Sequence, residues 1–297
     1  MIDDLAAERA RLVRHAYHML GSHVDAEDVV QDAFVRWQRG ERSNVRDAHK
    51  YLRAAVTNLS IDRLRERASA RETYVGPWLP EPILLDESAV PESAVTLAED
   101  VSFAFLLALE RLSPLERAAF LLHDALDIPF AEIATLLERS EESVRQLASR
   151  ARHAIRESRP KRTAARVDAV AMRERFANAL LSGDIAALTA LLSDDVRLLS
   201  DGGGKKLAAI NPLAGPDRVG RFLHGVMRKG GGRIVEIRPA WINGLAGFAT
   251  FWEDGLDQAL AIESDGEKIT AIYISRNPDK LASVAKALGD VPIGLSR

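Results

Sequence analysis

Apolar residues recur every three or four positions along the first 70 residues, which is the spacing of one face of an α-helix. The pattern predicts three helices, over residues 5–20, 25–39 and 49–67. Gly21 follows the first helix as a typical terminating residue. Acidic residues lie near the start of the second helix, where they also suit the helix dipole. This part of the chain is therefore predicted to be entirely helical.

A proline-rich and acidic stretch, residues 71–97, interrupts the helical pattern and predicts an ordered or semi-extended linker. Helical spacing resumes at Asp100. Further on, Ser113-Pro114 followed by Glu116 has the pattern of a capped helix start.

Residues 130–156 have the pattern of a helix-turn-helix. A short amphipathic helix contains Ile133 and Leu137, and Ser140 is placed to cap a second helix over residues 141–156. One face of the second helix is apolar, and the other presents arginine, glutamine and serine. Such a helix suits the major groove of DNA, where Arg and Gln pair with base edges and further Arg contacts phosphate.

The alternative for this helix is an ordinary solvated face, because short helices rich in Ala, Leu and Arg are common. One position also departs from the usual pattern, since the turn residue that is commonly glycine is Glu138. A left-handed conformation there costs about 1–2 kcal/mol, which a folded domain can absorb.

The pattern changes after Asp168. The sequence predicts three helices here: one to Leu181, a short one to Leu192 after a break at 182–184, and a later one over 216–227. Segments of alternating polarity accompany them. These segments predict strands at 196–199, 233–241, 246–252, 258–264 and 269–275. The chain is therefore predicted to be multidomain, with all-α parts followed by an α+β domain in which a curved antiparallel sheet wraps around helices.

Composition narrows the class of protein. The 297 residues contain no cysteine, which excludes disulfides, thiol catalysis and cysteine-ligated metals. No long apolar run or signal sequence is found, so a cytoplasmic protein without a membrane anchor is expected. The net charge of −3 hides opposed blocks: residues 36–71 hold ten bases against four acids, residues 140–166 hold eight against three, and residues 81–100 hold six acids and no base. Two nucleic-acid contacts separated by an acidic connector are expected.

Enzymatic chemistry finds little support. Asp201, His224 and Asp254 are candidates for acid–base work in the C-terminal part, but they form no recognisable pair. The Gly-rich turn at 201–205 lacks the first glycine and the hydroxyl residue of a phosphate loop, so a docking turn is the favoured interpretation. The histidines at positions 15, 18 and 23 lack matching ligands. No cofactor, metal site or catalytic residue is predicted.

Three strings in the first 160 residues together resemble a sigma factor of RNA polymerase, of the compact extracytoplasmic-function class. They are "DAEDVVQDAFVRWQR" at 25–39, "YLRAAVTNLSIDRLR" at 51–65 and "LSPLERAAFLLHDALDIPFAEIATLLERSEESVRQLASRAR" at 112–152. The resemblance implies a region 2 helical bundle over 1–70, a linker over 71–97 and region 4 with its helix-turn-helix over 98–160.

Residues 168–281 resemble a SnoaL-like domain, of the same fold as nuclear transport factor two. Sigma factors of the SigJ type have this extension, and the strings "WLPEP" at 78–82, "DGGGK" at 201–205 and "NPDKL" at 277–281 are similar to that subgroup. Residues 161–167 are expected to be a second linker and 282–297 a tail.

The resemblance implies four sets of functional residues. Those implied to bind core polymerase are Asp25, Asp28, Gln31, Asp32 and Phe34. Those implied to bind the opened minus-10 element are Lys50, Arg53, Asn58, Asp62 and Arg63. Those implied to bind the minus-35 element are Ser143, Arg145, Gln146, Ser149, Arg150, Arg152 and His153. A regulatory set comprises Trp78, Leu79, Pro80, Glu81, Pro82, Asp201, Gly202, Gly203, Gly204, Lys205, Asn277, Pro278, Asp279, Lys280 and Leu281.

The favoured hypothesis is a sigma factor that directs core polymerase to minus-35/minus-10 promoters. The three strings are expected to meet, so that the fused domain restrains the DNA-binding regions without a separate anti-sigma protein. An unknown small ligand in the SnoaL-like pocket is a further expected partner. Two alternatives are a ligand-sensing repressor or activator, which has no use for residues 25–65, and a SnoaL-like enzyme, which requires substrate turnover.

Overall fold

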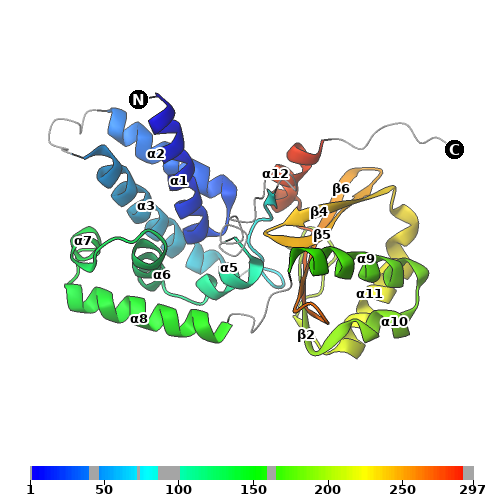
Figure 1. Ribbon diagram of the computed structural model, residues 1–297. Helices are drawn as coiled ribbons and strands as arrows, with labels where there is room; N and C mark the ends of the chain where they lie inside the picture. The colour runs from blue at the N-terminus through cyan, green and yellow to red at the C-terminus, as the bar shows by residue number, and fades with distance from the viewer. Residues whose placement is uncertain (1, 40–46, 72–73, 86–100, 159–164, 290–297) are drawn as a thin grey trace. The chain divides into compact units, whose positions relative to one another are not determined.

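The computed structural model describes residues 2–39, 47–71, 74–85, 101–158 and 165–289 (Figure 1). The chain divides into two compact units. The helical unit comprises Met1–Thr73 and Ala104–Arg159, and the sheet unit comprises Tyr74–Phe103 and Pro160–Arg297. The described residues that follow the first helices, 74–85 and 101–103, therefore belong with the sheet unit.

The helical unit begins with three helices, α1 (Ile2–Leu20), α2 (His23–Gln38) and α3 (Ala48–Arg71), which pack on one another. Their apolar stripes meet in a core where Tyr17, Val30 and Val56 are at most 1% exposed. The predicted helices are confirmed. α2 begins two residues earlier than expected, because the Ser22 hydroxyl accepts a hydrogen bond from the backbone N–H of Asp25 at 3.3 Å and caps the helix.

The second part of the helical unit contains the predicted helix-turn-helix. Its elements are α5 (Phe103–Glu110), α6 (Pro114–Phe120), the π-helical turn η3 (Leu121–Ala125), α7 (Phe130–Leu136) and α8 (Glu141–Ser158). Ser113 and Glu116 form a reciprocal capping box at the start of α6. The Ser140 hydroxyl accepts from the N–H of Ser143 at 3.2 Å, which starts α8 where the sequence predicts.

A buried arginine joins the two parts of the helical unit. Arg117 of α6 is 2% exposed, and its guanidinium donates to the carbonyl of Met19 at 2.5 Å and to Glu110 at 2.8 Å. The Met19 carbonyl lies in the last turn of α1, where helical carbonyls lack intrahelical partners. Because a buried charge without partners is costly, Arg117 favours the packed arrangement of α1 against α6.

Two buried histidines lie in the same region. His15 contacts the Thr57 hydroxyl at 3.0 Å, and the ring of His18 packs edge-on against Phe105 of α5. Burial, followed by the nearby His18 and Arg53, lowers the pKa of His15 to about 3. Burial, followed by Arg14, lowers the pKa of His18 to about 4. Both imidazoles are therefore structural groups held in the neutral form.

The sheet unit follows with two helices, a strand pair, a helix and four further strands. The elements are α9 (Arg166–Ser182), α10 (Ile185–Ala190), β2 (Leu192–Asp201), β3 (Leu213–Ala214), α11 (Pro216–Gly230), η4 (Gly231–Arg233), β4 (Glu236–Ile242), β5 (Leu245–Trp252), β6 (Gly255–Ser264), β7 (Ile269–Ser275) and α12 (Pro278–Leu288). The predicted α+β domain is confirmed.

The sheet has the strand order β1-β4-β5-β6-β7-β2-β3, in which the edge strand β1 (Leu84–Leu85) comes from the linker. Every pairing is antiparallel except that of β2 with β7, which is parallel. The sequence predicts an antiparallel sheet, and the parallel pairing of β2 with β7 departs from that prediction. β1 was not predicted from the sequence, because a two-residue strand has too little alternation to detect.

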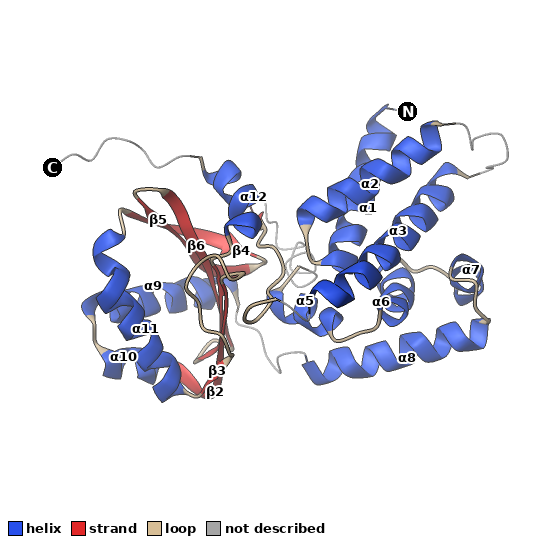
Figure 2. Ribbon diagram, turned by 180° about the vertical axis from the view of Figure 1, so that it is seen from behind, coloured by secondary structure: helices blue, strands red, loops and turns tan. Residues whose placement is uncertain are grey.

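The sheet has two differently covered faces (Figure 2). Helices α9, α10 and α11 cover one face, over a core that contains Phe176, Leu198, Leu223 and Ile272. Helix α12 lies on the other side, and its Leu281 and Val284 are buried. Among the helices that the structure describes, none is long and apolar enough to cross a membrane.

The turn residue Glu138 is left-handed, with φ of 52°. We predict that Glu138→Gly raises the stability of the helix-turn-helix by about 1 kcal/mol, because glycine adopts this conformation without the Cβ penalty. Slower amide exchange in α7 and α8 measures the effect. The control, Glu142→Gly within α8, should instead destabilise the helix by about 1 kcal/mol. Equal effects of the two substitutions would contradict the prediction.

The lowered pKa values of His15 and His18 predict acid sensitivity of the α1–α3 bundle. Unfolding lets each imidazole recover a pKa near 6.5 and take up a proton, so stability is lost as the pH falls below 6.5 towards 4. At pH 5 the loss is about 2 kcal/mol for each histidine. Amide exchange in α1 and α3 measured against pH should show this slope, and His18→Leu should reduce it. An unchanged slope in that variant would refute the assignment to His18.

Candidate functional site

The exposed face of α2 is acidic and polar. Asp28, Gln31 and Asp32 are all exposed and lie on neighbouring turns of the helix. Asp25 is half-buried and forms an ion pair with Arg67 of α3, and Phe34 is also half-buried. The structure therefore brings three of the five predicted residues into one exposed patch, and Asp25 lies within the bundle contact.

The predicted minus-10 residues are distributed along α3 and differ in exposure. Lys50, Asn58 and Asp62 are exposed, whereas Arg53 and Arg63 are half-buried. Lys50 Nζ lies 3.3 Å from a carboxylate oxygen of Glu132 on α7. Asp62 is paired with Arg65 at 3.2 Å. At one end, α3 therefore contacts the helix-turn-helix through a cation that was predicted to face DNA.

A neighbouring aromatic pair supports α3 from the side. The ring centroids of Trp37 and Tyr51 are 5.3 Å apart, and both side chains are half-buried. Trp37 of α2 therefore packs against α3.

The predicted minus-35 residues lie on the side of α8 opposite its buried stripe. Val144, Ala148, Ala151 and Ile155 are buried against the rest of the unit. Five of the predicted side chains are exposed: Arg145, Gln146, Ser149, Arg150 and His153. The other two, Ser143 and Arg152, are half-buried. The sequence therefore predicted the face of this helix correctly.

Three of the four arginines of α8 are paired with acids of the same helical unit. Arg150 Nε lies 2.8 Å from Glu116 of α6, and Arg152 Nε lies 2.7 Å from Asp124 of η3. Burial opposes ionisation of Glu116, but hydrogen bonds from Ser113 and Arg150 lower its pKa. These ion pairs orient the guanidiniums, and a DNA phosphate can replace the carboxylates because the pairs are exposed or half-buried.

The C-terminal end of β2 contains a buried carboxylate, Asp201, which is 0% exposed. Its Oδ1 accepts hydrogen bonds from the Tyr74 hydroxyl at 2.6 Å and from the N–H of Gly203 at 3.0 Å. Its Oδ2 accepts from the N–H of Leu79 at 2.9 Å and from Lys280 Nζ at 2.7 Å. Linker, Gly turn and α12 therefore all supply donors to one side chain.

Side chains around Asp201 complete this linker site. Lys280 Nζ also donates to the Leu79 carbonyl and lies 4.1 Å from the ring centroid of Trp78. Asn277 donates to the Tyr74 hydroxyl at 3.1 Å. Burial, followed by the hydrogen bond and charge of Asp201, raises the pKa of Tyr74, so the phenol keeps the proton that it donates.

The remaining residues of the three strings differ in exposure. Leu79, Pro80, Glu81 and Pro82 are buried, and the Ser283 hydroxyl donates to Glu81 at 3.0 Å. Leu281 is buried as well. The exposed members are Gly204, Lys205, Pro278 and Asp279, of which Lys205 and Asp279 form an ion pair at 2.6 Å. The structure therefore brings all three predicted strings together.

The Gly turn owes its composition to close contacts. A Cβ on Gly202 would lie 2.1 Å from the carbonyl oxygen of Lys206, and one on Gly203 would lie 2.3 Å from Asn277 Nδ2. Gly203 also has φ of 58°. The turn therefore needs glycine for both space and backbone conformation, which fits a docking turn rather than a phosphate loop.

Residues outside the three strings also hold the linker. Asn243, fully buried in the turn between β4 and β5, accepts from the N–H of Ile83 at 2.9 Å and donates to the carbonyl of Val101 at 2.7 Å. Phe103 stacks on Tyr273 with ring centroids 4.9 Å apart. Sequence reasoning missed Tyr74, Asn243 and Ser283. Asn243-Gly244 is a recognisable hairpin turn, but that signal does not reveal a linker contact.

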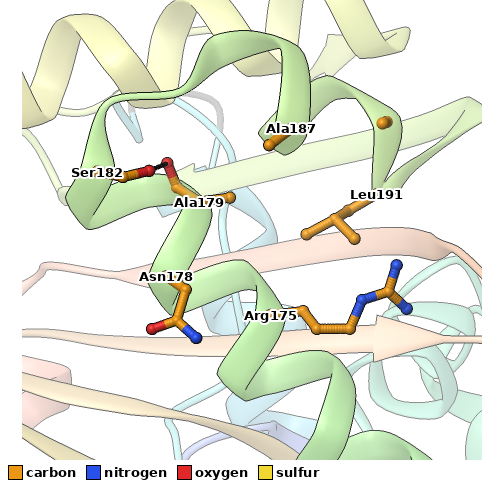
Figure 3. Close-up of a pocket in the computed structure, with 7 residues that line it drawn as sticks. Arg175, Asn178, Ala179, Ser182, Ala187 and Leu191 are labelled. Carbon is orange, nitrogen blue, oxygen red and sulfur yellow. Dashed lines mark hydrogen bonds between the residues drawn. The ribbon is translucent and has the colours of Figure 1, made fainter.

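The catalytic candidates are not assembled. The Asp201 carboxylate is saturated by structural donors, and Asp254 is exposed near Lys206 at 3.9 Å. His224 lies on α11. A depression of about 570 Å³ lies between α9 and α10, lined by residues that include Arg175, Asn178, Ser182 and Leu191 (Figure 3). None of the three candidates is among its lining residues.

Comparison with known proteins agrees with this arrangement. Residues 5–70 match the model of Sigma-70 region 2, and residues 102–155 match that of Sigma-70, region 4. The ECF RNA polymerase sigma factor SigJ of Mycobacterium tuberculosis is 38% identical over 94% of this chain and 92% of its own length. The probable ECF sigma factor SigI of that organism is 30% identical, over 95% of both chains.

A solved structure extends the similarity to the sheet unit. The crystal structure of Mycobacterium tuberculosis SigJ matches with a TM-score of 0.76 and 34% identity, over 95% of this chain and 98% of that one. The similarity therefore extends over both the helical unit and the sheet unit. The chain belongs to the extracytoplasmic-function family of RNA polymerase sigma factors, which are transcription initiation factors and not enzymes.

Proposed function

We propose that this sigma factor binds core polymerase through the acidic face of α2, the opened minus-10 strand through α3 and the minus-35 duplex through α8. The sheet unit regulates these contacts by holding the linker between the two DNA-binding regions. The observation that carries the regulatory part is the convergence of linker, Gly turn and α12 donors on Asp201. Core polymerase and promoter DNA are the partners.

The three surfaces differ in ways that suit their targets. Carboxylates on the rigid helix α2 steer towards a basic protein surface and fix its register. Cations and amides along α3 suit an unpaired strand, whose phosphates and exposed base edges both need partners. Arginine and glutamine on α8 suit base edges in the major groove, with Arg152 and His153 placed nearer the phosphates.

Promoter geometry requires the helical unit to open. The minus-35 and minus-10 elements are separated by about 25 base pairs, or about 85 Å of duplex. A compact unit of about 130 residues has a radius of gyration of only about 14 Å. The contacts of Arg117 with Met19 and of Lys50 with Glu132 therefore belong to a closed form, and DNA binding at both elements replaces them.

The linker is long enough for the open form only when it is released. An extended chain of about 30 residues between α3 and α5 spans about 100 Å. In the closed form, Ile83 and Val101 are both bonded to the side chain of Asn243, and Tyr74 and Leu79 are bonded to Asp201. Both ends of the linker are then fixed on one sheet, so its reach falls far below the promoter spacing.

Two further parts of the proposal concern partners. A separate anti-sigma protein is not required, because the groups that hold the linker belong to the same chain. A small ligand of the sheet unit would bind in the depression between α9 and α10, whose alanine and leucine walls and Arg175 fit an apolar molecule with an anionic group.

For the minus-35 contact we predict that Arg150→Ala weakens promoter binding by about 1–3 kcal/mol. If Arg150 contacts a base, the loss depends on the base at one promoter position. If it contacts phosphate, the loss is the same for all sequences. Footprinting of holoenzyme on a promoter selected from a random-sequence library measures the loss. Arg9→Ala removes an exposed arginine of α1 as the control and should leave the footprint unchanged. An intact minus-35 footprint with Arg150→Ala would remove this residue from the contact.

For the linker site we predict that Asp201→Asn releases the linker. Asparagine keeps the shape of the side chain, but its NH₂ group faces the hydrogen-bond donors. Lys280 also loses its buried anionic partner, which lowers the stability of the linker site by about 3–5 kcal/mol. Proteolysis within residues 74–85 should accelerate more than tenfold, and run-off transcription at limiting sigma factor should increase.

The matched control is Lys205→Gln, which removes the exposed pair with Asp279 and should cost at most about 1 kcal/mol. Released linker with unchanged transcription would show that the sheet unit does not restrain initiation. A linker that stays protected in Asp201→Asn would show that this carboxylate does not hold it.

A further inference from the structure

Helix α11 has one buried side and one strongly basic side. Val219 and Leu223 are buried in the core beneath the sheet. Residues 216–233, which comprise α11 and η4, contain five Arg or Lys and one acid. The exposed cations of the helix are Arg218, Arg221, Arg228 and Lys229.

Within the described part of the chain, these cations have no polar or charged partner. Among the residues that the structure describes, none of the four makes a hydrogen bond or an ion pair. By contrast, Arg145, Arg150 and Arg152 of α8 are each paired with a carboxylate of their own unit. The positive charge of α11 is therefore available to an external group.

Helix stability does not account for all of this charge. Arg228 and Lys229 lie in the last turn, where cations suit the helix dipole. Arg218 lies in the first turn, where the same dipole opposes a cation. Its place at the start of the helix therefore points to an interaction outside the fold.

A glycine within the basic side gives an independent indication. Gly225 lies one turn after Arg221 and about one turn before Arg228, and a Cβ there would meet nothing within 4 Å. A mid-helix glycine costs about 1 kcal/mol relative to alanine. Gly220 differs, because a Cβ there would lie 2.8 Å from the Thr189 hydroxyl. Internal packing thus explains Gly220, whereas Gly225 leaves room for a group approaching from outside.

We propose that the basic side of α11 binds the phosphate backbone of promoter DNA, as a third, sequence-independent contact. From residue 218 to residue 229 the helix rises about 16 Å. One DNA strand presents about five phosphates over that length. Because two DNA-binding regions lie on the same chain, the local concentration of duplex around α11 is high once the promoter is bound. This inference rests on the sigma-factor function.

An anionic lipid surface fits these observations less well. Amphipathic helices that bind membranes insert their apolar side into the lipid. The apolar side of α11 is already buried, with Val219 0% and Leu223 4% exposed. The outward-facing side is mainly charged, with Val226 as its one large exposed apolar residue among those described, which suits a phosphate chain better than a lipid surface.

The test compares holoenzymes containing the full chain on one promoter fragment at several salt concentrations. For R221Q/R228Q we expect the slope of log affinity against log salt to fall by about 1.8, and the affinity at 0.15 M salt to fall by about tenfold or more. R221K/R228K keeps both charges and should retain most of the affinity. R197Q/K286Q removes two exposed cations from β2 and α12 and should change neither value.

Several results would overturn the proposal. These are an unchanged slope for R221Q/R228Q, an equal loss for R197Q/K286Q, weaker binding of R221Q/R228Q to core polymerase in the absence of DNA, and loss of binding to phosphatidylglycerol vesicles with DNA affinity intact. Run-off transcription by the unmodified chain tests the sigma-factor function separately, so failure of either idea can be recognised.

Discussion

The buried carboxylate of Asp201 is the constraint on which the linker, the Gly turn and the start of α12 depend. A charge removed from water requires strong donors nearby, or it becomes a large penalty. Here the donors come from Tyr74, Leu79, Gly203 and Lys280, and the backbone carbonyl of Asp201 also accepts from the N–H groups of Arg276 and Asn277. Loss of any one segment leaves the carboxylate undersatisfied, so the segments are held together cooperatively.

In the proposed function, this cooperativity lets the sheet unit control how far the linker can extend. Two small anchors, at Asp201 and Asn243, decide how much of the linker is free to extend. The helices α2, α3 and α8 are already formed, so in this account DNA binding only has to displace the ion pairs of Lys50, Arg150 and Arg152. Regulation in this account acts on the distance between the surfaces, and the closed form is favoured further by buried Arg117.

Short-range sequence signals made most of the helices predictable. Helical periodicity, the Ser140 cap and the Ser113-Pro114 start depend on residues within a few positions of one another, so three helices and the helix-turn-helix followed from the sequence. The Ser22 cap was missed, and the start of α2 was therefore predicted two residues too late. The Gly turn was likewise recognised as a docking turn. The contacts of Tyr74 with Asp201, 127 positions apart, and of Asn243 with Val101, 142 positions apart, have no local signature. The parallel pairing of β2 with β7 is also long-range, and periodicity does not specify it.

The most direct test is amide hydrogen exchange of residues 74–83 in the full chain, first alone and then bound to core polymerase on promoter DNA. The account predicts strong protection in the free chain, above all at the N–H groups of Leu79 and Ile83, and loss of that protection in the promoter complex. Equal protection in both states would contradict it, because the linker would then remain on the sheet while both promoter elements are bound.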